Sequence, residues 1–270
     1  MTDPNPSPPP ATLALLRAPA TTLATDCELT HVARRPIDVA RIAAEHAAYA
    51  QALRDAGLQV TVLAGEPALP DSVFVEDAAL VLDELAVLTR PGAASRRAEP
   101  ALLADALAAL RPGLARIEAP GTLDGGDVLR IGRELWVGLT TRTNAGGIAQ
   151  LAAITAPFGY RVQGVPLGPS LHLKTACTAL DDETLLANPA WVDTAALGGR
   201  RIIAVDPDEP FAANVLRLDG AWVVNAAFPR TRARIEAHAR ATGVRVHAVE
   251  LMEFGKAEAG LTCLSLVFRR

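Results

Sequence analysis

Cysteine is scarce in this chain: 270 residues contain only Cys27, Cys177 and Cys263, with no CxxC pair among them. An odd number of widely spaced cysteines argues against a disulfide framework or a zinc knuckle and favours a reducing, cytoplasmic setting. The chain also lacks a basic excess, because 26 Lys and Arg face 30 Asp and Glu and leave a net charge of −4. That balance argues against nucleic acid, or an anionic membrane surface, as a partner.

Long apolar runs without charge are missing too, and none approaches the roughly 20 residues that a membrane helix needs. The opening segment MTDPNPSPPP has neither the basic nor the apolar region of a secretory signal. We expect residues 1–10 to be a disordered tail. No long linker divides the remainder, so residues 11–270 are expected to form a single domain of the soluble globular class, in which 50% of the residues are hydrophobic.

Short apolar strands alternate with alanine-rich amphipathic helices along the chain. The helices are expected at 39–56, 99–110, 144–156 and 231–242. The strands are expected at 13–17, 60–63, 79–82, 86–89, 127–131, 135–138, 184–187, 202–205, 215–218, 221–225, 245–249 and 264–268. Tight turns join several strand pairs, which argues against a purely parallel sheet. Helix, hairpin and strand recur about every fifty residues, a period that favours a closed repeat architecture.

Polar residues interrupt the apolar strands in a few stretches, and none of them is strong evidence alone. A lone cysteine before a buried strand, such as Cys263, is usually a small hydrophobic residue. His172, between two leucines, is equally typical of a core position, and Asp124-Gly-Gly-Asp127 is typical of a turn. Taken together, however, a thiol, an imidazole and several carboxylates form the minimum set for covalent catalysis.

The charges of these stretches indicate the substrate. Four acids expected at strand ends suit a cation: Asp71, Glu76, Asp77 and Asp124. Arg96 and Arg142 suit a carboxylate. An amino acid with a cationic side chain would satisfy both groups.

Six segments resemble, in order and spacing, the successive motifs of the dimethylarginine dimethylaminohydrolases: DSVFVED, TRPGAASRR, LDGGDVL, GLTTRTN, LHLKT and GLTCLSL. The likeness runs from about residue 11 to residue 268. It implies an α/β fold of the five-bladed propeller type with pseudo-fivefold symmetry. It also implies hydrolysis of Nω-methylated arginine to citrulline and dimethylamine or methylamine, with no metal and no organic cofactor.

The resemblance also implies roles for single residues. Cys263 matches the nucleophile that forms a covalent S-alkylthiouronium, His172 the general acid and base, and Asp124 the acid that orients this histidine. Asp77, together with Glu76, matches the acids that hold the guanidinium.

The remaining matches concern the amino-acid end of the substrate. Asp71 and the backbone carbonyl of Ala257 match positions near the α-ammonium, Arg96 and Arg142 match those near the α-carboxylate, and Leu29 matches a mobile lid leucine. Animal members often read Val-Asp-Gly where this chain reads Ala257-Glu258-Ala259. This difference leaves the exact guanidine substrate open.

Three alternatives remain beside this interpretation. The same Cys and His machinery could act on free arginine or another substituted guanidine, although Lys174 stands where the arginine and agmatine deiminases have a second carboxylate. The chain could be a non-catalytic propeller module, or bind an inhibitory metal at Cys263 and His172. The sequence is compatible with a homodimer and does not fix the oligomeric state.

Overall fold

The computed structural model describes residues 12–270, so the tail expected at residues 1–10 lies outside the described part. The strands are β1 (Thr12–Arg17), β2 (Gln59–Leu63), β3 (Ala79–Val81), β4 (Leu85–Leu88), β5 (Gly113–Arg116), β6 (Val128–Ile131), β7 (Glu134–Leu139), β8 (Arg161–Pro166), β9 (Cys177–Ala179), β10 (Thr184–Ala187), β11 (Arg201–Ala204), β12 (Leu216–Leu218), β13 (Ala221–Asn225), β14 (Arg245–Val249) and β15 (Leu266–Arg269). The α-helices are α1 (Leu23–Asp26), α2 (Val39–Asp55), α3 (Val75–Ala78), α4 (Ala104–Ala108), α5 (Ala145–Thr155), α6 (Leu173–Ala176), α7 (Pro229–Thr242) and α8 (Met252–Gly255). Short 3-10 turns are η1 (Pro70–Val73), η2 (Ala94–Arg96), η3 (Glu99–Leu103), η4 (Gly125–Asp127), η5 (Ala156–Phe158), η6 (Thr194–Ala196) and η7 (Thr262–Leu264).

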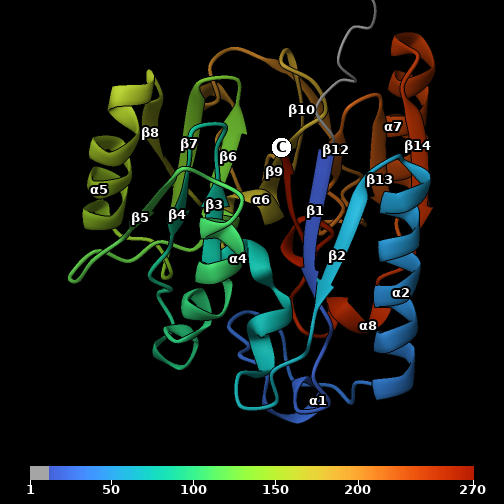
Figure 1. The fold of residues 1–270 in the computed structure, drawn as a ribbon. Helices are drawn as coiled ribbons and strands as arrows, with labels where there is room; N and C mark the ends of the chain where they lie inside the picture. The colour runs from blue at the N-terminus through green and yellow to red at the C-terminus, as the bar shows by residue number, and fades with distance from the viewer. Residues whose placement is uncertain (1–11) are drawn as a thin grey trace, which may run out of the picture.

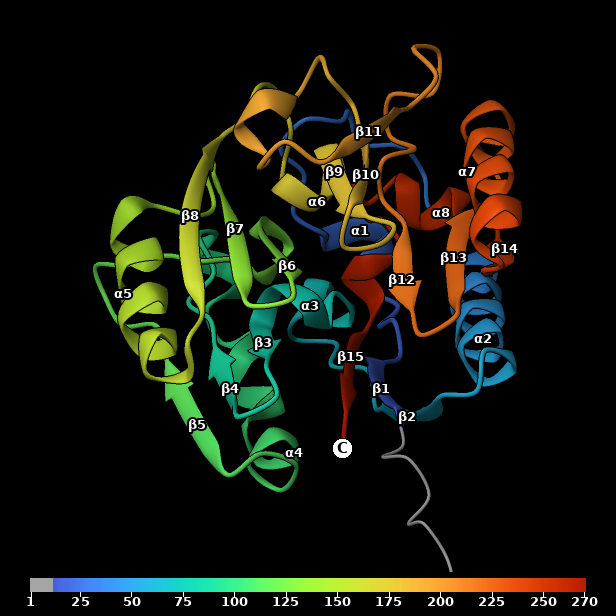
Figure 2. The ribbon, with the colours of Figure 1, turned by 90° about the horizontal axis from the view of Figure 1, so that it is seen from above.

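The strands form five three-stranded sheets around a common centre (Figures 1 and 2). In chain order the sheets are β15-β1-β2, β3-β4-β5, β6-β7-β8, β9-β10-β11 and β12-β13-β14. In every sheet the first two strands are antiparallel and the third is parallel to the second. The expected five-bladed α/β propeller is therefore confirmed.

Helical segments connect the second and third strands of each blade on the outside of the ring. The longest, α2, is capped at its N-terminus by Asp38, whose side chain accepts hydrogen bonds from the backbone N–H groups of Ala40 and Arg41. In α7 a proline occupies the first turn, and Gly243 ends the helix in the left-handed conformation. The helix expected at 99–110 is instead divided into η3 and α4, and only its second half is α-helical. Within residues 12–270, no helix combines the length and the apolar character that a membrane crossing requires.

The ring is closed by two strands far apart in the sequence. β15 pairs with β1 in antiparallel register, with Leu13 opposite Phe268 and Leu15 opposite Leu266. The first blade is thus built from segments near both ends of the described chain, and Figure 2 shows β15 at the inner side of β1.

The buried apolar side chains lie in separate clusters between neighbouring blades. For example, Leu88 and Val81 of the second blade pack with Leu15 and Phe268 of the first. Similar clusters occupy the other boundaries between blades. Each blade is therefore stabilised by burial against its two neighbours.

A single helical turn comes directly before the first strand of several blades. Helix α3 precedes β3, η4 precedes β6, α6 precedes β9, and η7 comes just before β15. These inner strands surround the centre in Figure 2, so the turns that precede them lie near one another there. The acids Glu76 and Asp77, expected at strand ends, lie on the α3 turn instead.

Candidate active site

A cavity of about 20 Å³ brings together most of the residues that the sequence singled out. Those that line it are Asp71, Asp77, Arg96, Arg142, His172, Ala257 and Cys263. Side chains from three of the five blades, from the connection between β2 and β3 and from the segment before β15 thus meet in one place. The volume suits about one water molecule, so the cavity is narrow in this structure.

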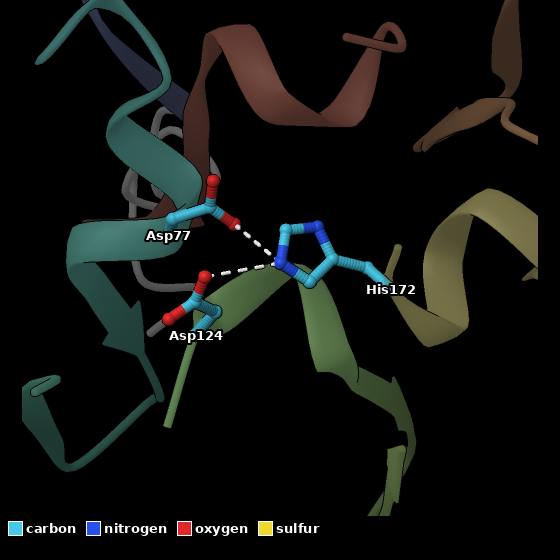
Figure 3. Close-up of side chains that lie close together, drawn as sticks. All are labelled: Asp77, Asp124 and His172. Carbon is cyan, nitrogen blue, oxygen red and sulfur yellow. Dashed lines mark hydrogen bonds and ion pairs between the residues drawn. The ribbon is translucent and has the colours of Figure 1, made fainter. Parts of the chain in front are cut away.

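His172 stands immediately before α6 and is held by two carboxylates, as Figure 3 shows. Its Nε2 atom lies 3.1 Å from Oδ2 of Asp124 and 3.9 Å from Oδ1 of Asp77. Burial by itself would lower the pKa of His172, but the charge of Asp77 and the hydrogen bond with Asp124 outweigh it and raise this pKa to about 9. The imidazole is therefore protonated near neutral pH. Its second nitrogen, Nδ1, forms no hydrogen bond with the described part of the chain.

The Asp124-Gly-Gly-Asp127 turn positions the histidine from both sides. Asp124 bonds the ring, while Oδ1 of Asp127 accepts the backbone N–H of Leu173 at 3.0 Å. A Cβ atom on Gly126 would lie 2.7 Å from Nδ1 of His172, so only glycine lets the turn come this close. Asp127 was part of the recognised motif but was not predicted as a site residue. Burial raises its pKa to about 6, although the charge of His172 opposes that change.

Asp77 supplies a fixed negative charge to the cavity. Its Oδ2 accepts a hydrogen bond of 2.7 Å from Nη1 of Arg96, and its Oδ1 accepts the N–H of Gly126 at 3.0 Å. Burial would raise the pKa of Asp77, yet the charges of His172 and Arg96 lower it to about 2. An ionised carboxylate at this depth favours a cationic ligand.

The two predicted arginines differ in their contacts. Arg96 is buried and donates from Nε and Nη2 to Glu99, at 2.9 and 2.8 Å, in addition to its bond with Asp77. Arg142 donates from Nη2 to the hydroxyl of Thr30, and its Nη1 lies 3.9 Å from Oδ2 of Asp124. Arg96 already bonds the two carboxylates of Asp77 and Glu99. Nη2 of Arg142 bonds only the neutral hydroxyl of Thr30. The role of both in binding an α-carboxylate stays a prediction.

Cys263 lies on η7 at the wall of the cavity. Its sulfur accepts a hydrogen bond from the backbone N–H of Gly260 at 3.4 Å. Burial and the negative charges of Asp77 and Glu76 raise the pKa of this thiol to about 12. Without ligand, the sulfur is therefore a neutral thiol.

A buried hydrogen-bond network behind Cys263 was not predicted from the sequence. Lys174 Nζ lies 2.5 Å from Oε1 of Glu76, and Oε2 of Glu76 accepts the hydroxyl of Thr262 at 2.7 Å. Asn214 bonds Thr262 through its side-chain nitrogen and oxygen, both at 3.0 Å. Glu76 is thus occupied by Lys174 and Thr262, and the network ties the turn that carries Cys263 to three other blades. Lys174 and Thr262 adjoin predicted residues, but Asn214 lies in no recognised motif.

Three further residues were predicted to bind or cover the amino-acid end of the substrate: Asp71, Ala257 and Leu29. Oδ2 of Asp71 accepts the backbone N–H of Glu28 at 3.0 Å, and burial raises the pKa of Asp71. Ala257 lines the cavity, and so does Glu28. Leu29 is half-buried and packs on the apolar cluster between the first and fifth blades, with its role in a lid remaining a prediction.

Asp77, Asp124 and His172 also present ligand atoms within 4.8 Å of one another, the spacing of a metal site. Two of these groups are engaged elsewhere: Asp77 bonds Arg96, and Asp124 accepts the N–H of Gly92. A cofactor-free site stays the prediction.

Comparison with known proteins decides the family. The family model of the eukaryotic N,N dimethylarginine dimethylhydrolases matches residues 28–167. The N(G),N(G)-dimethylarginine dimethylaminohydrolase of Streptomyces coelicolor is 40% identical over 260 residues, covering 96% of this chain and 98% of that protein. The enzyme of the same name from Pseudomonas aeruginosa is 36% identical over 255 residues, covering 94% and 98%. The chain belongs to the dimethylarginine dimethylaminohydrolase family.

Solved structures of this family agree with the assignment. A cysteine-to-serine mutant of the Pseudomonas aeruginosa protein, complexed with citrulline, has a TM-score of 0.89 at 35% identity and covers 94% of this chain and 98% of that one. An adduct of a dimethylarginine dimethylaminohydrolase with S-methyl-L-thiocitrulline gives 0.88 at 34% identity, with coverage of 94% and 98%. The N-terminal domain of a cyanobacterial arginine dihydrolase gives 0.79 at 22% identity, which shows a common fold.

Proposed function

We propose that this chain hydrolyses Nω-methylated arginine, both asymmetric dimethylarginine and monomethylarginine, to citrulline and dimethylamine or methylamine. The observation that carries the proposal is the convergence of Cys263, His172 and Asp77 on one cavity. They are a nucleophile, a protonated acid and a fixed anion for the guanidinium. Citrulline in the related Pseudomonas aeruginosa structure supports the same product here. Residues 11–270 would act as a single catalytic domain.

Substrate binding would activate the thiol. The negative charges of Asp77 and Glu76 help to raise the pKa of Cys263. A guanidinium held by Asp77 places a positive charge beside the sulfur and lowers this pKa, so the thiol proton leaves for solvent. The reactive thiolate thus forms mainly in the presence of a cationic substrate.

The chemistry then follows from the protonation state of His172. The thiolate attacks the guanidino carbon, and the imidazolium of His172 gives its proton to the departing amine. The C–N bond breaks and leaves the S-alkylthiouronium on Cys263. Neutral His172 next takes a proton from a water molecule that adds to the same carbon. The C–S bond then breaks and releases the thiolate, and the hydroxyl proton passes to solvent as the C=O bond of citrulline forms.

The contacts of Lys174 support an alkylated substrate. In this chain the position two residues after the histidine is a lysine that bonds Glu76, so it offers no second carboxylate to the guanidinium. A dimethylated nitrogen has no N–H group, and a buried carboxylate facing it would lack a partner. Unsubstituted arginine has those N–H groups and is expected to bind less well.

The amino-acid end of the substrate would be held by residues on the other side of the cavity. Arg142 is proposed to bind the α-carboxylate, and Asp71 with the carbonyl of Ala257 to bind the α-ammonium. Leu29 is proposed to cover the substrate as part of the lid. Arg96 is proposed to lie near the α-carboxylate of the substrate. Its hydrogen bonds to Asp77 and Glu99 also hold in position the carboxylate of Asp77, which is proposed to face the guanidinium.

The deciding experiment is to incubate the purified protein with asymmetric dimethylarginine, monomethylarginine and arginine and to measure citrulline. We expect the two methylated substrates to be preferred. Cys263→Ser should abolish turnover, while Cys177→Ala, which alters a buried cysteine in β9 that lies away from the cavity, should retain it. A preference for arginine would instead establish the same chemistry on another guanidine, and an unchanged rate in Cys263→Ser would eliminate covalent catalysis.

A cytoplasmic location and a homodimer complete the proposal. The three unpaired cysteines support a reducing compartment. Light scattering coupled to gel filtration would measure the oligomeric state directly.

A further inference from the structure

Glu258 has an unusual backbone and an unusual set of partners. Its φ angle of 59° places it in the left-handed region, as the only residue other than glycine to show this in the described chain. Its carboxylate accepts the backbone N–H groups of three consecutive residues: Thr30 at 2.8 Å, His31 at 2.5 Å and Val32 at 2.6 Å. Both carboxylate oxygens are thus committed to a segment more than 220 positions away.

The segment that Glu258 holds is also bonded to the proposed substrate-binding residues. We call residues 28–32 the lid segment. The N–H of Glu28 donates to Asp71, and the hydroxyl of Thr30 accepts from Arg142 at 2.8 Å. Ser95 donates to the carboxylate of Glu28 at 2.7 Å. The lid segment is therefore bonded to Asp71, Arg142 and Glu258, which all line the cavity.

The cavity is too narrow for a substrate unless part of its wall, which includes Glu28, shifts. The cavity has a volume of about 20 Å³ and a wall formed in part by Glu28. That is space for about one water molecule, whereas an arginine derivative contains more than ten heavy atoms. A substrate can enter only when part of the wall opens.

The bonds of the neighbouring residues locate the moving part. Glu253 accepts the N–H of Asp38 at 2.8 Å, and Nζ of Lys256 donates to the carbonyl of Pro36 at 2.9 Å. These contacts fix the chain just after the lid segment. Residues 28–32 themselves are bonded to the segment that leads to Cys263 mainly through the three hydrogen bonds of Glu258.

We propose that Glu258 is the residue that keeps the lid segment closed over the bound substrate. Only the expected change in KM rests on the proposed function; the closure of the lid segment by Glu258 does not. Glu258 lies between Ala257 and Ala259, which both line the cavity, and two residues before Gly260, whose N–H bonds the sulfur of Cys263. Lid closure is thereby linked to the backbone next to the nucleophile. The left-handed conformation of Glu258 aims its side chain at the lid segment, where glycine would offer no carboxylate.

The test compares Glu258→Gln and Glu258→Gly with Glu250→Gln. Glutamine keeps the size of the side chain but places an N–H donor against the backbone N–H groups of the lid segment. Glycine adopts the left-handed conformation readily and removes the carboxylate. Glu250 is an exposed acid on the same segment, without a contact to the lid, and serves as the control. Hydrogen–deuterium exchange of the peptide that spans residues 28–34 is measured in the ligand-free proteins.

We expect exchange in residues 28–34 to accelerate about tenfold in both Glu258 variants, because three charge-assisted hydrogen bonds are lost. Glu250→Gln should match the wild type. With asymmetric dimethylarginine, the KM of both Glu258 variants should rise about tenfold, while kcat should change much less. Unchanged exchange in the glutamine variant, or protection retained in the glycine variant, would overturn the proposal. The exchange result needs no turnover, so it stays informative if the wild type fails to hydrolyse methylated arginine.

Discussion

His172 and Asp124 come from different blades and meet through a hydrogen bond of 3.1 Å between Nε2 and Oδ2. Both side chains are buried, with relative exposures of 3% and 0%. A second pair in the molecule, His238 and Asp181, has nearly the same length of 3.0 Å but lies outside the cavity. Replacing the aspartate in each pair therefore separates the effect of Asp124 on the pKa of His172 from the effect of losing any His–Asp pair on the stability of the fold.

The pKa of His172 should fall when Asp124 is replaced by asparagine. The carboxylate favours the imidazolium, so its removal leaves burial, which favours the neutral ring, less opposed. From about 9 in the wild type, the pKa of His172 should drop by about 1 to 3 pH units. NMR titration of the histidine ring measures this directly, and kcat should decline because less imidazolium is available for the departing amine. In Asp181→Asn, the titration of His172 should not move; a similar change there would assign the effect to the fold as a whole.

Gly126→Ala should abolish most of the activity without unfolding the protein. The new methyl group would lie 2.7 Å from both Nδ1 of His172 and Oδ1 of Asp77, so one of these side chains must shift. A displacement of about 1 Å in a catalytic group costs roughly 100-fold in rate, and citrulline release measures the loss. Gly255→Ala provides the control, because its Cβ atom meets nothing within 4 Å. Equal rates in the two variants would contradict the close packing of this turn.

Lys174→Met should destabilise the protein. It leaves the buried carboxylate of Glu76 with the hydroxyl of Thr262 as its remaining partner. Removal of one member of a buried ion pair costs about 3–5 kcal/mol, measured as the free energy of unfolding in a denaturant titration. Arg217→Met removes a contact with Asp182 in which both side chains are exposed, and there the loss should stay below about 1 kcal/mol. Equal losses in the two variants would argue against a special contribution of the buried network.

Arg142→Lys should impair substrates that carry an α-carboxylate. The planar guanidinium binds a carboxylate with two N–H groups, and lysine cannot reproduce this geometry. We expect the KM for asymmetric dimethylarginine to rise about tenfold, for a loss near 1.4 kcal/mol. A methylated guanidine without the carboxylate should be hydrolysed equally by wild type and variant. If its hydrolysis weakened as much, Arg142 would act on the guanidino end through Asp124.

The recurring hairpin and helix predicted a closed repeat architecture, while the five-bladed propeller was implied by the family resemblance. Three strands were nevertheless missed: β5, β8 and β9. β8 has mostly exposed or half-exposed residues and ends in Pro166, so its apolar pattern is weak. β9 follows α6 directly, with no turn residue to mark its start.

The sequence identified Cys263 and His172 as candidates, but the one-turn helices that carry the site residues were hidden. A single turn of three or four residues has no periodic pattern to recognise. The partners of Glu76 are set by contacts between blades, and no local pattern indicates that Lys174 and Thr262 would bond its carboxylate. The same holds for Glu258, whose three partners lie in the first blade. Tertiary neighbours, which the local sequence does not record, determine these roles.

The pairing of β15 with β1 makes the position of the nucleophile depend on a contact between distant parts of the chain. Cys263 stands three residues before β15, and that strand lies against a segment from the opposite end of the described chain. The acids and the imidazole belong to other blades, so a local separation of these two strands would displace the sulfur while leaving its partners in position. The reactive centre is therefore only as rigid as the seam that joins the two ends of the described chain.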